Sequence, residues 1–135
     1  MNKKNKDLTL ARECSIKIIY QHLITGEKNA DIYHYFQDKR TYNKRFLEKL
    51  IEFSDKKASH ITKTLSSHTD LDLSTITKID HAILYLGTVE LLYFKDTPKS
   101  VILNECVDLA KKFSSDEAYK FINSILDTVG SKLRR

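Results

Sequence analysis

Apolar side chains repeat along this chain at steps of three and four residues, the spacing of one face of an α-helix. In residues 78–94 they fall on nearly every side of such a helix, and a helix of that kind is normally buried. Thr77 is a typical N-cap before it, and Asp80 stands in the acidic position of a capping box. We therefore predict that residues 78–94 form the central helix of the core, where Gly87 allows a crossing helix to approach closely.

Amphipathic patterns predict further helices on both sides of this segment. The first ends at Gly26, which suits a left-handed C-cap. A short helix is capped by Asp31, and a long one starts at Asn43. The last opens with the capping box Ser114-x-x-Glu117 and ends at Gly130. The other predicted ranges are 8–25, 31–38, 43–66 and 100–113.

Glycine and proline are scarce, with three and one in the chain, so tight turns and hairpins are few. This favours an all-α fold, a compact helical bundle. At 135 residues the chain fits one domain, and no repeat or linker divides residues 1–135. Residues 1–7 are polar and basic, and we expect them to form a flexible arm.

The search for catalytic chemistry gives no site. The five histidines lack metal-ligand spacing, and no glycine-rich phosphate loop is present. His81 follows Asp80 directly, and adjacent residues on a helix point about 100° apart, so they do not form a facing pair. We expect no enzyme activity, metal or cofactor.

The N-terminal segment, the central helix and the two cysteines indicate the cellular compartment. The N-terminus has no apolar core of a secretory signal, and the central helix is too short for a membrane span. Cys14 and Cys106 are isolated, which is typical of buried, reduced thiols. We expect a cytoplasmic protein without membrane contact.

A net charge of +5 makes an acidic partner plausible. Four cations, Lys3, Lys4, Lys6 and Arg12, lie close together near the N-terminus. Lysine and arginine pair with phosphates, and exposed aromatic rings stack on unpaired bases, so RNA binding is one interpretation. A solubilising tail is the other.

Three stretches of sequence carry a resemblance to a known family. Residues 11–14 read A-R-E-C, and residues 83–93 read I-L-x-L-G-x-x-E-L-L-Y. Residues 98–113 read P-x-x-V-x-x-N-E-x-V-x-L-A-K-x-F. Together, in this order and spacing, they resemble the NusB family of bacterial transcription antitermination factors. Residues 27–70 resemble it only in pattern.

The resemblance implies a fold of two packed three-helix bundles. It also implies binding of the boxA element of nascent single-stranded RNA together with NusE, a small ribosomal subunit protein. This assembly belongs to the antitermination complex of RNA polymerase and promotes read-through on ribosomal RNA operons.

The resemblance also implies which residues bind RNA, in a basic arm and at the start of the last helix. Arg12 is the strongest single candidate. Phe121 also fits the inward stripe of its helix, so core packing and base stacking both remain open for it. Two departures from the family stand out: the arm carries lysines rather than arginines, and Ser124 replaces a usual glycine, where it is expected to crowd a helix contact. The implied RNA-binding set is Lys3, Lys4, Lys6, Arg12, Lys120, Phe121 and Asn123.

Another class of function stays open beside this one. The chain fits a non-enzymatic helical module for protein–protein contact, or a homodimer, without any RNA role. NusB-like domains also occur attached to RNA methyltransferases, but 135 residues leave no room for a cofactor-binding domain. Salt-dependent binding of boxA-like RNA separates an antitermination factor from a module that contacts only proteins.

Overall fold

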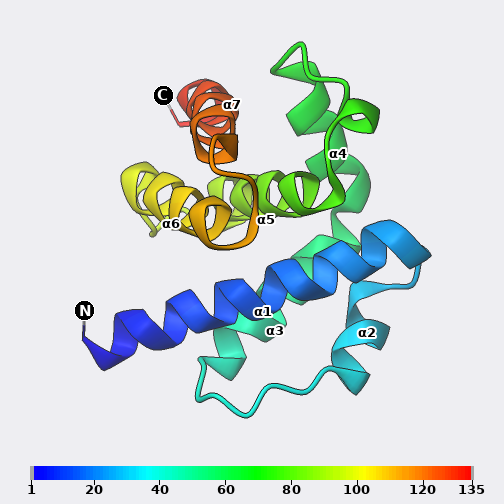
Figure 1. Cartoon of the computed structure of the whole chain (residues 1–135), viewed down its shortest axis with the longest axis vertical. Helices are drawn as coiled ribbons and strands as arrows, with labels where there is room; N and C mark the ends of the chain where they lie inside the picture. The colour runs from blue at the N-terminus through cyan, green and yellow to red at the C-terminus, as the bar shows by residue number, and fades with distance from the viewer. Residues whose placement is uncertain (1, 135) are drawn as a thin grey trace.

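The computed structural model describes residues 2–134, which contain seven α-helices, one short 3₁₀ helix and no strand (Figure 1). The predicted all-α class is confirmed. The elements are α1 (Lys3–Thr25), α2 (Asn29–Tyr35), α3 (Lys44–Lys56), α4 (Ala58–Ser67), η1 (Leu73–Thr75), α5 (Lys78–Tyr93), α6 (Lys99–Phe113) and α7 (Ala118–Leu133).

The first helix is longer than its apolar pattern predicts. It begins at Lys3 instead of Leu8, because the Asn2 side chain accepts a hydrogen bond from the Asn5 N–H at 2.9 Å and caps the first turn. The segment expected to be a flexible arm is therefore helical from Lys3 onward, and Met1 lies outside the described residues. The other end matches the prediction, since Gly26 adopts φ 77° as a left-handed C-cap.

The long helix expected over residues 43–66 is two helices. The chain leaves helical geometry at Lys57, with φ −114° and ψ 21°, so α3 ends there and α4 starts at the next residue. The apolar repeat continues across this break because Leu50 and Ile61 both face the core. A repeat that stays in phase gives no sign of a kink between two helices.

The short helix α2 starts at Asn29 and ends at Tyr35, so the predicted cap at Asp31 is wrong. Its N-terminus is capped from another helix. The carboxylate of Asp55 in α3 accepts hydrogen bonds from the backbone N–H groups of Asn29 and Ala30, both at 2.9 Å. This contact also ties α2 to α3.

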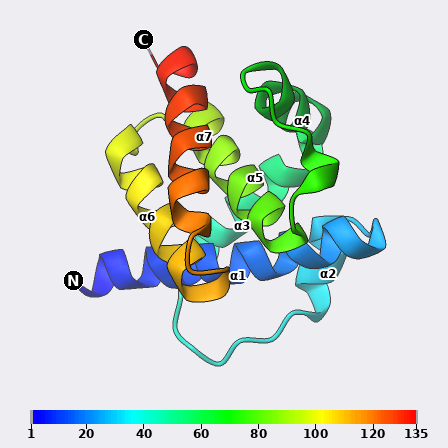
Figure 2. The same ribbon diagram turned by 45° about the horizontal axis from the view of Figure 1, so that its top comes forward.

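The central position of α5 is confirmed. It passes through the middle of the molecule and contacts α1, α3, α4, α6 and α7 (Figures 1 and 2). Thr77 caps it by accepting a hydrogen bond from the Asp80 N–H at 3.2 Å. The Asp80 carboxylate accepts a hydrogen bond from the Ser114 hydroxyl and not from the backbone of Thr77. Only the Thr77 half of the predicted capping box therefore forms.

Gly87 is a point of close approach, as the sequence predicts. A methyl group added there would lie 2.7 Å from Cδ1 of Leu126 in α7 and 3.2 Å from Sγ of Cys106 in α6. All three residues are in the buried centre of the fold. The absence of a side chain at residue 87 therefore lets α6 and α7 pack directly on α5.

We expect Gly87→Ala to destabilise the protein. Overpacking a filled core costs about 1–3 kcal/mol, and the better helix propensity of alanine returns only about 1 kcal/mol. Gly130→Ala is the matched control, because its added methyl meets mainly the flexible end of the Lys99 side chain, 3.0 Å away. Urea denaturation should show a lower midpoint for Gly87→Ala and an unchanged or higher one for Gly130→Ala. Equal midpoints would contradict the close packing.

The last helix begins at Ala118, four residues after the predicted capping box at Ser114, and no side-chain cap forms at Glu117. It also continues past Gly130, the predicted end, to Leu133. Gly130 is helical and lies against Leu91 of α5 and Lys99 of α6. Beyond it, Arg134 donates to the carbonyl oxygens of Thr97 and Phe94 near the end of α5.

The helices form two groups. Helices α1, α2 and α3 pack together, and α4, α6 and α7 pack around α5. A small apolar cluster joins α1–α3, while the main core combines α5 with side chains from both groups, including Ile16 of α1 and Leu50 of α3. The expected pair of three-helix bundles is thus approximated, with α4 as an additional helix in the second group.

Candidate nucleic-acid interface

Lys3, Lys4 and Lys6 lie in the first turns of α1 and are exposed. Among residues 2–134, none of the three forms an ion pair. The N-terminus of a helix is the positive end of its dipole, so lysines there disfavour the helix and favour a bound anion. The placement suits an anionic partner better than it suits helix stability.

Arg12 does not belong to this surface. Its side chain is 3% exposed, and its Nε and Nη2 donate to the two carboxylate oxygens of Glu90, both at 2.8 Å. Nη1 lies 3.4 Å from Oε1 of Glu105. Burial by itself lowers the pKa of Arg12. The hydrogen bond and the charge of Glu90 outweigh this effect, so the pKa is raised overall and the guanidinium stays charged. The expectation that Arg12 contacts RNA is withdrawn, because this group joins α1 to α5 and α6.

The start of α7 presents Lys120 and Asn123 to solvent, as residues three apart on one helix face. Lys120 lies 3.0 Å from the carboxylate of Glu117 in an exposed ion pair, which is weak and easily exchanged. Ser124 is also exposed, so it does not crowd a helix contact as its departure from the family pattern suggested.

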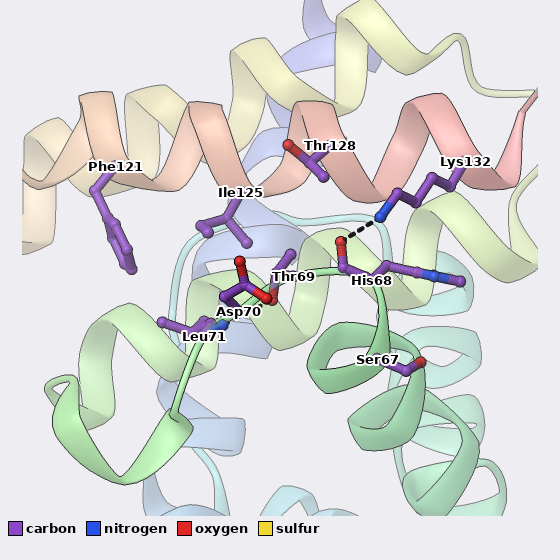
Figure 3. A pocket seen from close by; sticks show the side chains of 9 residues that line it. All are labelled: Ser67, His68, Thr69, Asp70, Leu71, Phe121, Ile125, Thr128 and Lys132. Atoms are coloured by element: carbon purple, nitrogen blue, oxygen red, sulfur yellow. Dashed lines mark hydrogen bonds between the residues drawn. The ribbon is translucent and has the colours of Figure 1, made fainter.

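Phe121 is half-buried and packs against the main core. Its ring points from α7 toward the chain segment between α4 and η1 (Figure 3). Together with Ile125 and Leu71 it lines an open cleft of about 560 Å³. Lys132 closes one end of this cleft, where its ammonium group donates to the carbonyl oxygen of His68 at 2.9 Å. Phe121 thus packs against the core and is still partly accessible from the cleft.

A basic and aromatic cluster that was not predicted from the sequence lies at the end of α6 and the start of α7. Phe113, at the end of α6, has the ammonium groups of Lys17 and Lys112 at 5.6 and 5.4 Å from its ring centre. Tyr119 has that of Lys111 at 4.8 Å. Such cation–π pairs leave both the charge and part of the ring accessible. The signal in the sequence is the pair of runs Lys111-Lys112-Phe113 and Tyr119-Lys120-Phe121 around one short loop.

The ion pair between α1 and α6 fixes this cluster beside α1. Glu13 accepts hydrogen bonds from the Lys112 ammonium at 3.0 and 3.1 Å and lies 3.2 Å from Nη1 of Arg40. The end of α6 is thereby held beside the middle of α1, while the first turns of α1 extend beyond it (Figure 2). The cluster therefore lies beside the middle of α1 and includes the start of α7, apart from the lysines in the first turns of α1.

Other chemistry has little support in the described part of the chain. Residues 2–134 contain no group of three or more metal-binding side chains, and none of their helices is long and apolar enough to cross a membrane. Burial raises the pKa of the Cys14 thiol to about 12 and that of Cys106 further, so both thiols stay protonated. Burial lowers the pKa of His81, which is half-buried.

Comparison with protein families matches residues 9–131 to the model described as the NusB family. The chain belongs to the NusB family. Curated NusB relatives agree with this. The transcription antitermination protein NusB of Proteus mirabilis (strain HI4320) is 30% identical over 128 residues, covering 93% of each chain. That of Acidovorax sp. (strain JS42) is 28% identical over 127 residues, covering 92% of this chain and 72% of the relative.

Solved NusB structures share the fold of this NusB-family chain. T. maritima NusB superposes with a TM-score of 0.81 at 28% identity, over 92% of this chain and 90% of that one. The fold is also that of a structure described as antitermination factors NusB and NusE in complex with dsRNA, with a TM-score of 0.77 at 22% identity. It covers 92% of this chain and 96% of the matched chain. The order and packing of the helices are therefore those of the family.

Proposed function

We propose that this chain is a transcription antitermination factor that binds boxA-type single-stranded RNA in nascent transcripts. It acts together with NusE, the small ribosomal subunit protein, within the antitermination complex of RNA polymerase, and promotes read-through on ribosomal RNA operons. It works by binding and not by catalysis, and its place of action is the cytoplasm, where transcripts are made. The match of residues 9–131 to the NusB family carries this proposal.

The distribution of charge supports an RNA partner. The lysines at the N-terminus of α1 have no acidic partner among residues 2–134, although the chain holds 18 acidic residues. The cluster at Phe113 and Tyr119 adds rings beside ammonium groups, the combination on which unpaired bases stack near a phosphate backbone. Lysine offers point charges without the paired hydrogen bonds of arginine, so these contacts set affinity more than sequence preference.

A binding titration tests this function. Labelled single-stranded boxA-like RNA, a scrambled strand and a duplex of the boxA-like sequence are each titrated with the protein, with and without NusE. We expect the boxA-like strand to bind most tightly, more tightly still with NusE, and more weakly as salt increases. Binding that ignores sequence, salt and NusE would contradict the proposal. If RNA does not bind and sedimentation shows a stable dimer, the protein–protein module becomes the better description.

A further inference from the structure

A groove of about 730 Å³ runs between the first turns of α1 and the loop that joins α2 to α3. Lys3, Lys6 and Leu10 line it from one face of α1, at steps of three and four residues. Lys39 and Arg40 line it from the loop. No function was predicted for this loop from the sequence, since it lies more than thirty positions from the N-terminal lysines.

Three contacts hold the loop against α1. The backbone N–H of Asn43 donates to the carbonyl oxygen of Asp7 at 3.1 Å. Nη1 of Arg40 donates to Oε1 of Glu13 at 3.2 Å, and the Cys14 thiol donates to the Asp38 carboxylate at 3.5 Å. Arg40 also binds Asp38 within the loop, at 2.7 Å from Nη2 to Oδ2. The groove is therefore shaped before any ligand arrives.

The groove keeps a surplus of positive charge. Two carboxylates, those of Asp38 and Glu13, offset the charge of Arg40. Lys3, Lys6 and Lys39 are exposed, and none of them forms an ion pair with another residue in the range 2–134. Asp7 is the one acidic side chain that lines this groove. Three ammonium groups around a groove at the positive end of a helix favour an anionic chain.

We propose that this groove binds the phosphate backbone of the RNA strand, with Lys39 as a contact that acts alongside Lys3 and Lys6. Arg40 holds the loop in place through Asp38 and Glu13. The proposal rests on the proposed function and extends it to the α2–α3 loop. Contacts to phosphates do not read bases. The groove therefore increases the number of nucleotides that the protein contacts, and the sequence preference of the protein stays unchanged.

Lys39→Ala tests the groove in a titration of single-stranded boxA-like RNA at several salt concentrations. One phosphate contact on a single strand contributes about 0.7 to the slope of log affinity against log salt. We expect the slope to fall by about 0.7 and the affinity at 0.1 M salt to fall about fivefold. Lys39→Arg keeps the charge and should bind as the unaltered chain does. Lys63→Ala removes an exposed lysine of α4 and is the matched control.

The outcomes separate the groove from the proposed function. A Lys39→Ala protein with the affinity and slope of Lys63→Ala overturns the groove, and the proposed function stands if the unaltered chain still binds RNA. Failure of the unaltered chain to bind RNA, with or without NusE, overturns both. Thermal melting accompanies each variant. If Lys39→Ala lowers the melting temperature, Lys39→Gln replaces it. Lys39→Gln and the unaltered chain are then compared at a temperature where both proteins are folded, and the change in salt slope decides.

Discussion

Replacing Arg12 with alanine is expected to lower the free energy of unfolding by about 3–5 kcal/mol, because a buried carboxylate loses its partner. Glu90 is fully buried, and Arg12 donates a hydrogen bond to each of its two carboxylate oxygens, at 2.8 Å each. Burial raises the pKa of Glu90, and Arg12 is the principal group that opposes this effect. Without the guanidinium, Glu90 must either stay charged in an apolar setting or take up a proton.

The double variant Arg12→Met/Glu90→Leu is the control for this prediction. Replacing both members of a buried ion pair by apolar groups of similar size is often neutral or stabilising. Urea denaturation of the single and double variants measures the difference. Arg40→Ala, which removes a half-exposed arginine from Asp38 and Glu13, should cost much less. An Arg12→Ala protein that unfolds like the unaltered chain but binds RNA poorly would show that Arg12 acts on RNA after all.

Replacing Lys3, Lys4 and Lys6 together with alanine is expected to weaken RNA binding about a hundredfold at 0.1 M salt. Each phosphate contact contributes about 0.7 to the salt slope, so three contacts lower the slope by about 2. The fold should not suffer, because removing positive charge from the N-terminus of α1 relieves an unfavourable interaction with the helix dipole. The melting temperature should therefore stay the same or rise.

A variant with alanine at Lys49, Lys63 and Lys95 is the matched control, since it loses the same charge from exposed positions on α3, α4 and the turn after α5. Its affinity should fall far less, because its lysines lie away from the first turns of α1. Salt titrations of both variants, with melting curves alongside, make the comparison. Equal losses in the two triple variants would mean that net charge alone attracts the RNA and that the start of α1 is no specific contact.

Local sequence determined the elements whose ends are fixed by neighbouring residues. Thr77 and Gly26 cap their helices through contacts within a few positions, and both were predictable. The apolar character of α5 fixed its place in the core, and the need for space at Gly87 followed from the cost of glycine inside a helix. The exposed lysines near the N-terminus were also found from sequence, because charge without an apolar pattern stays in water.

Tertiary structure decided what depends on distant residues. In the sequence, Arg12 stands close to the N-terminal lysines and resembles part of a basic patch. In the fold its guanidinium is buried and paired with Glu90, 78 positions away. The start of α2 depends on Asp55 of α3, and the groove depends on the α2–α3 loop lying beside the first turns of α1. Sequence spacing reports which side chains share a helix face. Which charges meet across helices is set by packing, since a buried charge is tolerated only where folding places its partner.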